Sequence, residues 1–265
     1  MIPDTLHLGP IPLHLFGMCL ALAFVAAGWA VGVELARRGF DRDASGRYVT
    51  WAAVGGIIGA RLWVVLDDWP AFVRDPVSFL LTGGGFVFYG GLFGGMVAVT
   101  LLTRRLGIPW LMTADITSPA IALGQAIGRW GCQLSGDGDW GTQTSGWWGM
   151  QYPYAVACDW PCDCTTGHCV WPPAIAVHPS PIYESLLYTA IFLCLRQLAG
   201  RGAPTGAVFA CYLILSATAR FAVETVRINP RVVFGLSEAQ LTSSVLVVVG
   251  SILLCTIRGW RTVAA

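Results

Sequence analysis

Seven apolar stretches run along the chain, separated by shorter polar segments. They cover residues 11–35, 48–66, 80–103, 110–128, 181–199, 205–224 and 239–257. An α-helix needs about 20 predominantly apolar residues to cross the hydrocarbon core of a bilayer, and each stretch is about that long. The pattern predicts an all-α, polytopic membrane protein with seven transmembrane helices. We expect a single membrane domain, residues 1–265, with an insertion on its outer face at residues 136–178.

The composition agrees with a location in a membrane. The chain has 265 residues, of which 55% are hydrophobic and 12% are charged, and its mean hydropathy is +0.63. A soluble domain carries about 25% charged residues, so this chain has too little polar surface for that class. The formal net charge of +1 identifies no partner, and we expect no nucleic acid among the ligands.

The arginines set the orientation of the predicted helices. They concentrate in alternate loops, at residues 37–47, 104–105, 196–201 and 258–261, whereas the opposite loops hold Asp residues and few Arg. Cytoplasmic loops carry an excess of basic residues, which predicts an N-terminus outside and a C-terminus inside the cytoplasm. No basic residue precedes the first apolar stretch, so we expect a retained helix and not a cleaved signal peptide.

The insertion at residues 136–178 is rich in Trp, Gly and Pro and carries four cysteines, Cys158, Cys162, Cys164 and Cys169. The predicted topology places this segment outside the cytoplasm, where thiols oxidise, and therefore favours two disulfides. The spacing leaves their pairing open. A tetrahedral zinc site and free or redox-active thiols are the alternatives. We expect the insertion to cap the outer face, with its Trp side chains at the level of the lipid headgroups.

Three arginines interrupt the apolar stretches or close them: Arg61, Arg129 and Arg220. A charge at the centre of a spanning helix costs about 2.5–3.5 kcal/mol on insertion scales, and such residues usually face a cavity lined by protein or water. A guanidinium group is planar and binds phosphate through two parallel donors. Three such groups in a chain this poor in charge predict a site for the phosphate of a lipid headgroup.

Two further features lie beside these arginines. Glu224 follows Arg220 by four residues on the same helical face, so the two side chains can pair, and Arg227 continues that face outward. For Arg220 and Glu224 the alternative is a purely structural pair that neutralises charge. For Arg227 the alternative is contact with lipid phosphates at the membrane surface. Cys132 follows Arg129 by three residues, and its role is open between packing and chemistry.

The stretch TGGGFVFYGGLFGG, residues 82–95, holds seven glycines in fourteen positions. Small residues allow close contact between membrane helices, but Gly disfavours a helix interior by about 1 kcal/mol relative to Ala. So many in succession predict a broken or re-entrant segment, which must be lined by protein or water. Tyr89 lies in its centre, either as a packing residue or as a hydroxyl group in the site.

HPSPIYE, residues 178–184, precedes the fifth apolar stretch. Ser180 suits the N-cap position, Pro181 the first helical position and Glu184 the first turn, so helix initiation explains these three residues. His178 and Tyr183 are not explained in this way. They either lie at the headgroup level or contribute to the site.

Together these motifs resemble those of the bacterial phosphatidylglycerol–prolipoprotein diacylglyceryl transferase family. The matching segments are LHLFGM around residues 14–18, GGIIGARLWVVL, FYGGLFGG, GRWGCQLSGDGDWG, HPSPIYE, ARFAVETVR and GLSEAQ. Their order and the predicted seven-helix plan also match that family. Residues 152–175, which carry the cysteines, lie outside the resemblance.

The resemblance implies transfer of a diacylglyceryl group from phosphatidylglycerol to the lipobox cysteine of a prolipoprotein, in the bacterial cytoplasmic (inner) membrane. Its partners would be phosphatidylglycerol, prolipoprotein substrates and membrane lipid, and no cofactor or metal is expected. The implied catalytic residues are Arg129, Arg220, Glu224 and Tyr89. The implied substrate-binding residues are Arg61, Gly90, Gly91, Asp137, His178, Tyr183 and Arg227.

In this interpretation Arg129 and Arg220 hold the phosphate as negative charge develops on the leaving group. Glu224 either positions Arg220 or accepts a proton, and Arg61 helps to line the lipid cavity. The chain departs from the common pattern at two motifs. Tyr89 replaces the His of His-Gly-Gly, and in GRxGNFxNGE, Cys132 and Ser135 replace the two Asn while Asp137 stands at the Glu. A related transferase with another acceptor, or a non-catalytic phospholipid-binding protein, is the alternative.

Overall fold

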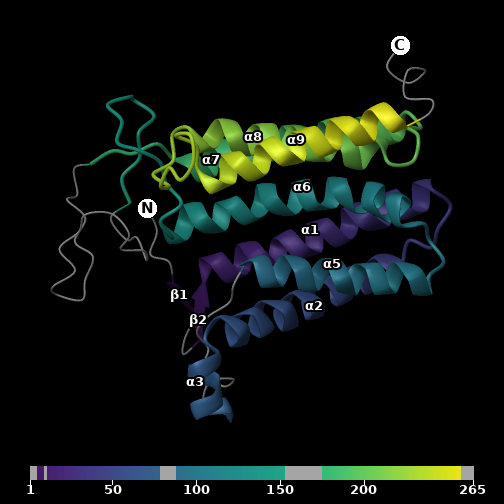
Figure 1. Cartoon of the computed structure of the whole chain (residues 1–265), viewed down its shortest axis with the longest axis horizontal. Helices are drawn as coiled ribbons and strands as arrows, with labels where there is room; N and C mark the ends of the chain where they lie inside the picture. The colour runs from purple at the N-terminus through teal and green to yellow at the C-terminus, as the bar shows by residue number, and fades with distance from the viewer. Residues whose placement is uncertain (1–4, 9–10, 78–87, 153–174, 258–265) are drawn as a thin grey trace. The chain divides into compact units, whose positions relative to one another are not determined.

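The computed structural model describes residues 5–8, 11–77, 88–152 and 175–257. Within these ranges the protein is all-helical apart from one short antiparallel hairpin, β1 (Thr5–Leu8) with β2 (Ile11–His14), in which Thr5 pairs with His14. The helices are α1 (Leu15–Arg37), α2 (Ala44–Asp67), α3 (Trp69–Arg74), α5 (Phe88–Arg105), α6 (Trp110–Ser135), α7 (Ser180–Gly200), α8 (Ala207–Glu224) and α9 (Glu238–Thr256) (Figure 1).

Each of the seven apolar stretches contains one long helix, and α3 is an additional short one. Four of the described helices, α1, α2, α8 and α9, are long and apolar enough to cross a membrane, which makes this a multi-pass membrane protein. α1 begins at Leu15 and not at residue 11, because residues 11–14 form strand β2.

The chain divides into two compact units, residues 31–113 and the remainder. In the first of these, α2 and α5 pack closely through facing glycines. A Cβ atom added at Gly59 would lie 2.7 Å from the Gly94 Cα and closer still to the Gly90 carbonyl oxygen. At Gly90 it would lie 2.5 Å from the Gly59 carbonyl oxygen and 2.5 Å from the Trp63 Cβ. Small residues four apart on both helices therefore let the two backbones touch.

The second half of the glycine-rich stretch differs from the expected broken form. Residues 88–95 form a regular part of α5, and residues 82–87 lie outside the described ranges. For residues 88–95 the prediction gave too much weight to the low helix propensity of glycine. In a membrane helix, tight packing against a neighbour offsets that propensity.

In the other unit, side chains of α6 fix the positions of α7 and α8. Asp115 is fully buried, and its two carboxylate oxygens accept hydrogen bonds from the backbone N–H groups of Gly206 (2.7 Å) and Phe209 (2.8 Å) at the start of α8. These N–H groups have no intrahelical acceptor, so Asp115 caps α8 from a neighbouring helix. The Ser185 hydroxyl of α7 donates to the Ala126 carbonyl oxygen at 2.8 Å. α8 also packs along α7 and α9, and the three lie side by side in Figure 1.

Three loop segments meet at one end of these helices. Backbone bridges join Gly141 to Arg227 and Val177 to both Gln143 and Met150. The Trp140 and Tyr152 rings pack together with 5.0 Å between their centroids, and Val177 completes a small buried core. Gly141 is required here, because a Cβ atom would lie 2.5 Å from the Val226 carbonyl oxygen. These contacts hold the loop after α6 beside the loop after α8.

The predicted insertion is described only at its two ends. The four cysteines for which we expect disulfides, Cys158, Cys162, Cys164 and Cys169, lie outside the described residues. The thiols of Cys19, Cys132, Cys194, Cys211 and Cys255 are free.

Candidate functional site

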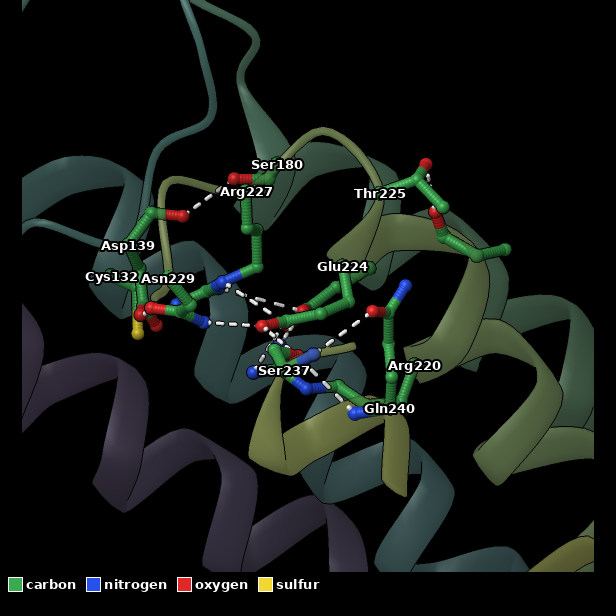
Figure 2. Close-up of polar contacts among 12 residues, drawn as sticks. Cys132, Asp139, Ser180, Arg220, Glu224, Thr225, Arg227, Asn229, Ser237 and Gln240 are labelled. Atoms are coloured by element: carbon green, nitrogen blue, oxygen red, sulfur yellow. Dashed lines mark hydrogen bonds and ion pairs between the residues drawn. The ribbon is translucent and has the colours of Figure 1, made fainter. Parts of the chain in front are cut away.

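Six charged side chains from three helices and two loops meet where these loops join α6, α7 and α8. We call them the arginine–carboxylate cluster: Arg129, Arg220, Arg227, Asp139, Glu184 and Glu224. Figure 2 shows four of these residues with their polar neighbours. All six belong to the same compact unit of the chain.

Glu184 of α7 is the centre of the cluster. Its side chain is only 2% exposed, and its carboxylate contacts Arg129 Nε of α6 and Arg220 Nη1 of α8, the latter at 2.5 Å. Arg227 Nη1 lies 3.6 Å from the same carboxylate. One buried anion therefore holds guanidinium groups from two different helices, and a carboxylate with four lone-pair sites is suited to this.

Asp139 holds a second pair of arginines from the loop side. Its two carboxylate oxygens accept hydrogen bonds from Arg129 Nη1 and Arg227 Nη2. The Asp139 backbone carbonyl oxygen in turn accepts a hydrogen bond of 2.5 Å from the Ser180 hydroxyl, which anchors the loop to the start of α7. Asp139 thus ties α6 and the loop after α8 together.

Glu224 completes the base of the cluster. Its side chain is 0% exposed, and its Oε2 lies 3.0 Å from Arg220 Nη2. The predicted pairing of Arg220 and Glu224 on one helical face is confirmed. Arg227, at 7% exposed, does not extend outward to the surface as expected, because Asp139 draws it into the cluster.

Two of the arginines in the cluster keep donors without a partner in the described part of the chain. The side chains of Arg129 and Arg220 are 26% and 24% exposed, whereas Glu184 and Glu224 beneath them are buried. Among the described residues, Arg129 Nη2 and Arg220 Nε have no hydrogen-bond or ion-pair partner. The carboxylates hold both guanidinium groups and leave these two donors available for an anion.

One further arginine borders the cluster. Arg231 donates from Nη2 to the Glu224 carbonyl oxygen at 3.2 Å. The three arginines and three carboxylates of the cluster have no formal net charge, and Arg231 on one side is matched by Asp137 on another. The case for an anionic ligand therefore depends on the unpaired donors and not on the net charge.

The two aspartates of the loop have opposite protonation behaviour. Burial opposes ionisation of Asp139, but the charges of Arg129 and Arg227 outweigh it and lower the pKa of that carboxyl. Burial and the nearby charge of Asp139 raise the pKa of Asp137. These shifts agree with the positions of the two residues. Asp139 contacts the arginines, whereas Asp137, the residue expected from the motif, lies beside Cys132.

Cys132, Asp137 and Asp139 place their ligand atoms within 4.8 Å of one another. Such a trio can hold a cation in principle. Here both oxygens of Asp139 already accept from guanidinium groups, and Arg129 Nη1 also lies 3.6 Å from the Cys132 sulfur. This positive charge makes the trio a poor cation site.

The HPSPIYE motif is arranged differently from its predicted form. α7 begins at Ser180 itself, so Pro181 is the second helical residue and Ser180 is not the N-cap. The Ser180 hydroxyl binds the Asp139 carbonyl oxygen, and this tertiary contact replaces capping. His178 Nδ1 lies 3.1 Å from the Tyr183 hydroxyl, and the His178 backbone binds Gly141 and Thr142.

The remaining predicted site residues belong to the other unit. Arg61 lies in α2, and Gly90 and Gly91 lie in α5 against α2. Tyr89 is in the first turn of α5, and its side chain is outside the described part of the chain. An apolar groove of about 710 Å³ runs along the α2–α5 crossing, and Arg61 is not among the described residues that line it.

Sequence reasoning missed the roles of Glu184 and Asp139. In the sequence, helix initiation is a sufficient explanation of Glu184, and it conceals an acidic side chain buried opposite two arginines. Asp137 fits the family motif in register, which draws attention away from Asp139. The sequence does contain a signal, because a buried Arg requires a carboxylate partner and Glu224 alone is too few for three arginines.

Comparisons with known proteins point to one family. A family model described as "Prolipoprotein diacylglyceryl transferase" matches residues 3–256. The protein named "Phosphatidylglycerol--prolipoprotein diacylglyceryl transferase" of Frankia alni is 32% identical over 260 residues, covering 94% of this chain and 64% of that protein. This chain thus spans less than two thirds of the length of that relative.

Two other relatives with the same name are closer in length. That of Staphylococcus saprophyticus is 27% identical over 255 residues, covering 95% of this chain and 88% of that protein. That of Finegoldia magna is 30% identical over 241 residues, covering 90% and 88% of the two chains.

Proposed function

The chain belongs to the prolipoprotein diacylglyceryl transferase family, and we propose that it carries out the reaction in the names of its relatives. Phosphatidylglycerol is the donor, and the thiol of the lipobox cysteine of a prolipoprotein is the acceptor. The cysteine sulfur forms a bond to the terminal glyceryl carbon of the diacylglyceryl group. The bond from that carbon to the phosphate oxygen breaks, and glycerol phosphate leaves with the electron pair.

The observation that supports this function is the Glu184 bridge between Arg129 and Arg220. It holds two half-buried guanidinium groups from different helices in one place, each with one donor that has no partner among the described residues. The leaving phosphate gains negative charge as the carbon–oxygen bond breaks, and fixed donors stabilise that charge without reorganising. Each group keeps one nitrogen donor that no described residue binds, so the two arginines together can bind a phosphate through two donors and orient the headgroup.

The acceptor thiol must lose its proton to become a nucleophile. Tyr89 stands where the family pattern has His. We propose that its hydroxyl group acts on the acceptor thiol, in the step in which the thiol loses its proton. We also propose contacts with substrate for Arg61, Gly90, Gly91, Asp137, His178, Tyr183 and Arg227. Support for His178 and Tyr183 comes from their hydrogen bond on the segment that holds Gly141.

We further propose seven transmembrane helices in the bacterial cytoplasmic membrane, with the N-terminus outside. The seven long helices and the arginine distribution support this topology. It places the ends of α6 and α8 that carry the cluster toward the outer leaflet, together with the aromatic insertion. Phosphatidylglycerol, prolipoprotein and bulk membrane lipid are then the partners that meet there.

The test combines purified protein, phosphatidylglycerol and a lipobox peptide, followed by mass spectrometry of the peptide. We expect a mass increase equal to one diacylglyceryl group. Arg129→Ala and Arg220→Ala should each lower the rate by about 100-fold or more, the usual cost of losing one donor to a developing oxyanion. Lipid bound without an adduct would contradict the transferase and favour a phospholipid-binding protein.

A further inference from the structure

The start of α9 forms a capping box whose side chains also reach the cluster. Ser237 is the N-cap, and its Oγ accepts from the Gln240 N–H at 3.3 Å while the Gln240 Oε1 accepts from the Ser237 N–H at 3.1 Å. A capping box ordinarily serves only to satisfy the first N–H groups of its helix. Here Ser237 and Gln240 are 1% and 3% exposed, and each has an additional partner.

The additional partner of Ser237 is Glu224. The Ser237 hydroxyl donates to Glu224 Oε1 at 2.9 Å, and Asn229 Nδ2 donates to the same oxygen at 2.6 Å. Arg231 Nη1 donates to Gln240 Oε1 at 2.6 Å, which fixes the loop that carries Asn229. Figure 2 shows Ser237, Asn229 and Arg220 gathered around the Glu224 carboxylate.

These contacts engage both oxygens of Glu224 in different ways. Oε1 accepts two hydrogen bonds, whereas Oε2 has no hydrogen-bond partner among the described residues and lies 3.0 Å from Arg220 Nη2 and 3.6 Å from Arg227 Nε. The side chain is 0% exposed. A general base must reach the proton that it removes, and in this arrangement Glu224 faces guanidinium groups and not a substrate thiol.

We propose that Ser237 and Asn229 are positioning residues for the proposed transfer reaction, on which this inference rests. They lock the Glu224 carboxylate in one orientation, and the locked carboxylate holds Arg220 in the plane that meets the lipid phosphate. Of the two roles open for Glu224 from the sequence, this arrangement selects the positioning of Arg220. The N-terminus of α9 thereby becomes part of the site although it contacts no substrate.

The experiment uses the full-length protein with Ser237→Gly and Asn229→Ala. Gly at an N-cap costs only a few tenths of a kcal/mol relative to Ser, so Ser237→Gly removes the donor to Glu224 with little loss of capping. Ser237→Thr retains a hydroxyl group and is the rescue variant. Ser244→Ala removes another hydroxyl of α9, which donates to the Gln240 carbonyl oxygen and touches no member of the cluster.

We expect Ser237→Gly and Asn229→Ala each to raise KM for phosphatidylglycerol about tenfold, the value for losing one hydrogen bond to a charged group. KM for the lipobox peptide should not change, and Ser237→Thr and Ser244→Ala should behave as the wild type. A merely structural defect would lower the fraction of active protein and leave both KM values unchanged. That result would overturn the proposal.

Two further measurements separate this inference from the function on which it rests. If Glu224 exchanged a proton with substrate, Asn229→Ala would displace the acid limb of the pH–rate profile, which would also overturn the proposal. Binding of a short-chain phosphatidylglycerol, followed by calorimetry, requires no turnover. Binding about tenfold weaker in both variants would support the positioning role even if the wild type formed no adduct, whereas unchanged binding would contradict it.

Discussion

The α2–α5 crossing and the arginine–carboxylate cluster join helices by opposite means. At the crossing, glycines bring two backbones into contact, and the groove beside them is lined by apolar residues such as Val54, Ile58 and Phe93. In the cluster, buried or half-buried charges from α6, α7 and α8 hold the helices through long side chains. The groove beside the crossing is apolar, whereas the cluster presents guanidinium groups that can bind an anion.

The comparison shows how the two kinds of contact differ in their tolerance of substitution. Contact between small residues is governed by shape, and any change that restores the shape restores the contact. A buried ion pair is different, because removing one partner leaves an uncompensated charge behind. We therefore expect the two regions to respond differently to substitutions of similar size.

The largest effect should follow from Glu184→Gln. This change removes the charge that Arg129 and Arg220 share, and breaking a buried ion pair in this way costs about 3–5 kcal/mol. We expect a loss of that size in the free energy of unfolding, together with loss of the diacylglyceryl adduct. Denaturant titration in detergent and the peptide assay measure the two effects.

Glu238→Gln is the matched control, since Glu238 is an exposed carboxylate in the first turn of α9. Its loss should cost less than about 1 kcal/mol, the usual value for a charge near a helix terminus. Equal losses in the two variants would mean that Glu184 does not hold the cluster together.

An intermediate effect is expected at the glycine crossing. In Gly59→Ala the new methyl group meets backbone atoms of Gly90 and Gly94, which cannot move aside as a flexible side chain would. Overpacking of this kind costs about 1–3 kcal/mol. The melting temperature of the purified protein in detergent should fall, and thermal unfolding measures the loss.

Gly56→Ala provides the control on the same helix. Its methyl group would lie 3.5 Å from the Gly91 carbonyl oxygen, an ordinary contact. Because Ala favours a helix by about 1 kcal/mol over Gly, this variant should be as stable as the wild type or more so. A destabilised Gly56→Ala would show that the crossing tolerates no side chain at either position.

The smallest effect concerns the pH dependence of Asp139→Asn. Arg129 and Arg227 lower the pKa of Asp139, so its ion pairs stabilise the fold above the unfolded value of about 3.9. The stabilisation should disappear as the pH falls through the lower, folded-state pKa. We expect Asp139→Asn to cost about 1.5 kcal/mol at pH 6–8, the lower end of the range for a hydrogen bond to a charged group.

Thermal unfolding of both proteins from pH 8 to pH 3 measures this difference. The difference between the wild type and the variant should shrink as the pH falls below about 3.9. A difference that grew on acidification would contradict the assignment of Asp139 as an ionised partner of the two arginines.

Much of the fold was accessible from the sequence, because the apolar stretches are a local property. The structure has a long helix in each of the seven predicted stretches, and the Arg220–Glu224 pair forms as its spacing predicted. Local reasoning failed where one residue type serves two purposes. Glycine at residues 88–95 disfavours an isolated helix but favours a packed one, and Ser180 suits an N-cap but binds Asp139 instead.

The sequence by itself determined the class of the protein, the positions of its long helices and the arginines at their ends. Hydrophobicity and helical spacing act over a few residues, so they can be read without knowing what lies nearby. Only the tertiary structure decided which carboxylates meet those arginines. Asp139, Glu184 and Ser237 become partners of residues far away in the chain because α6, α7, α8 and α9 converge at one end, and no local pattern encodes that convergence.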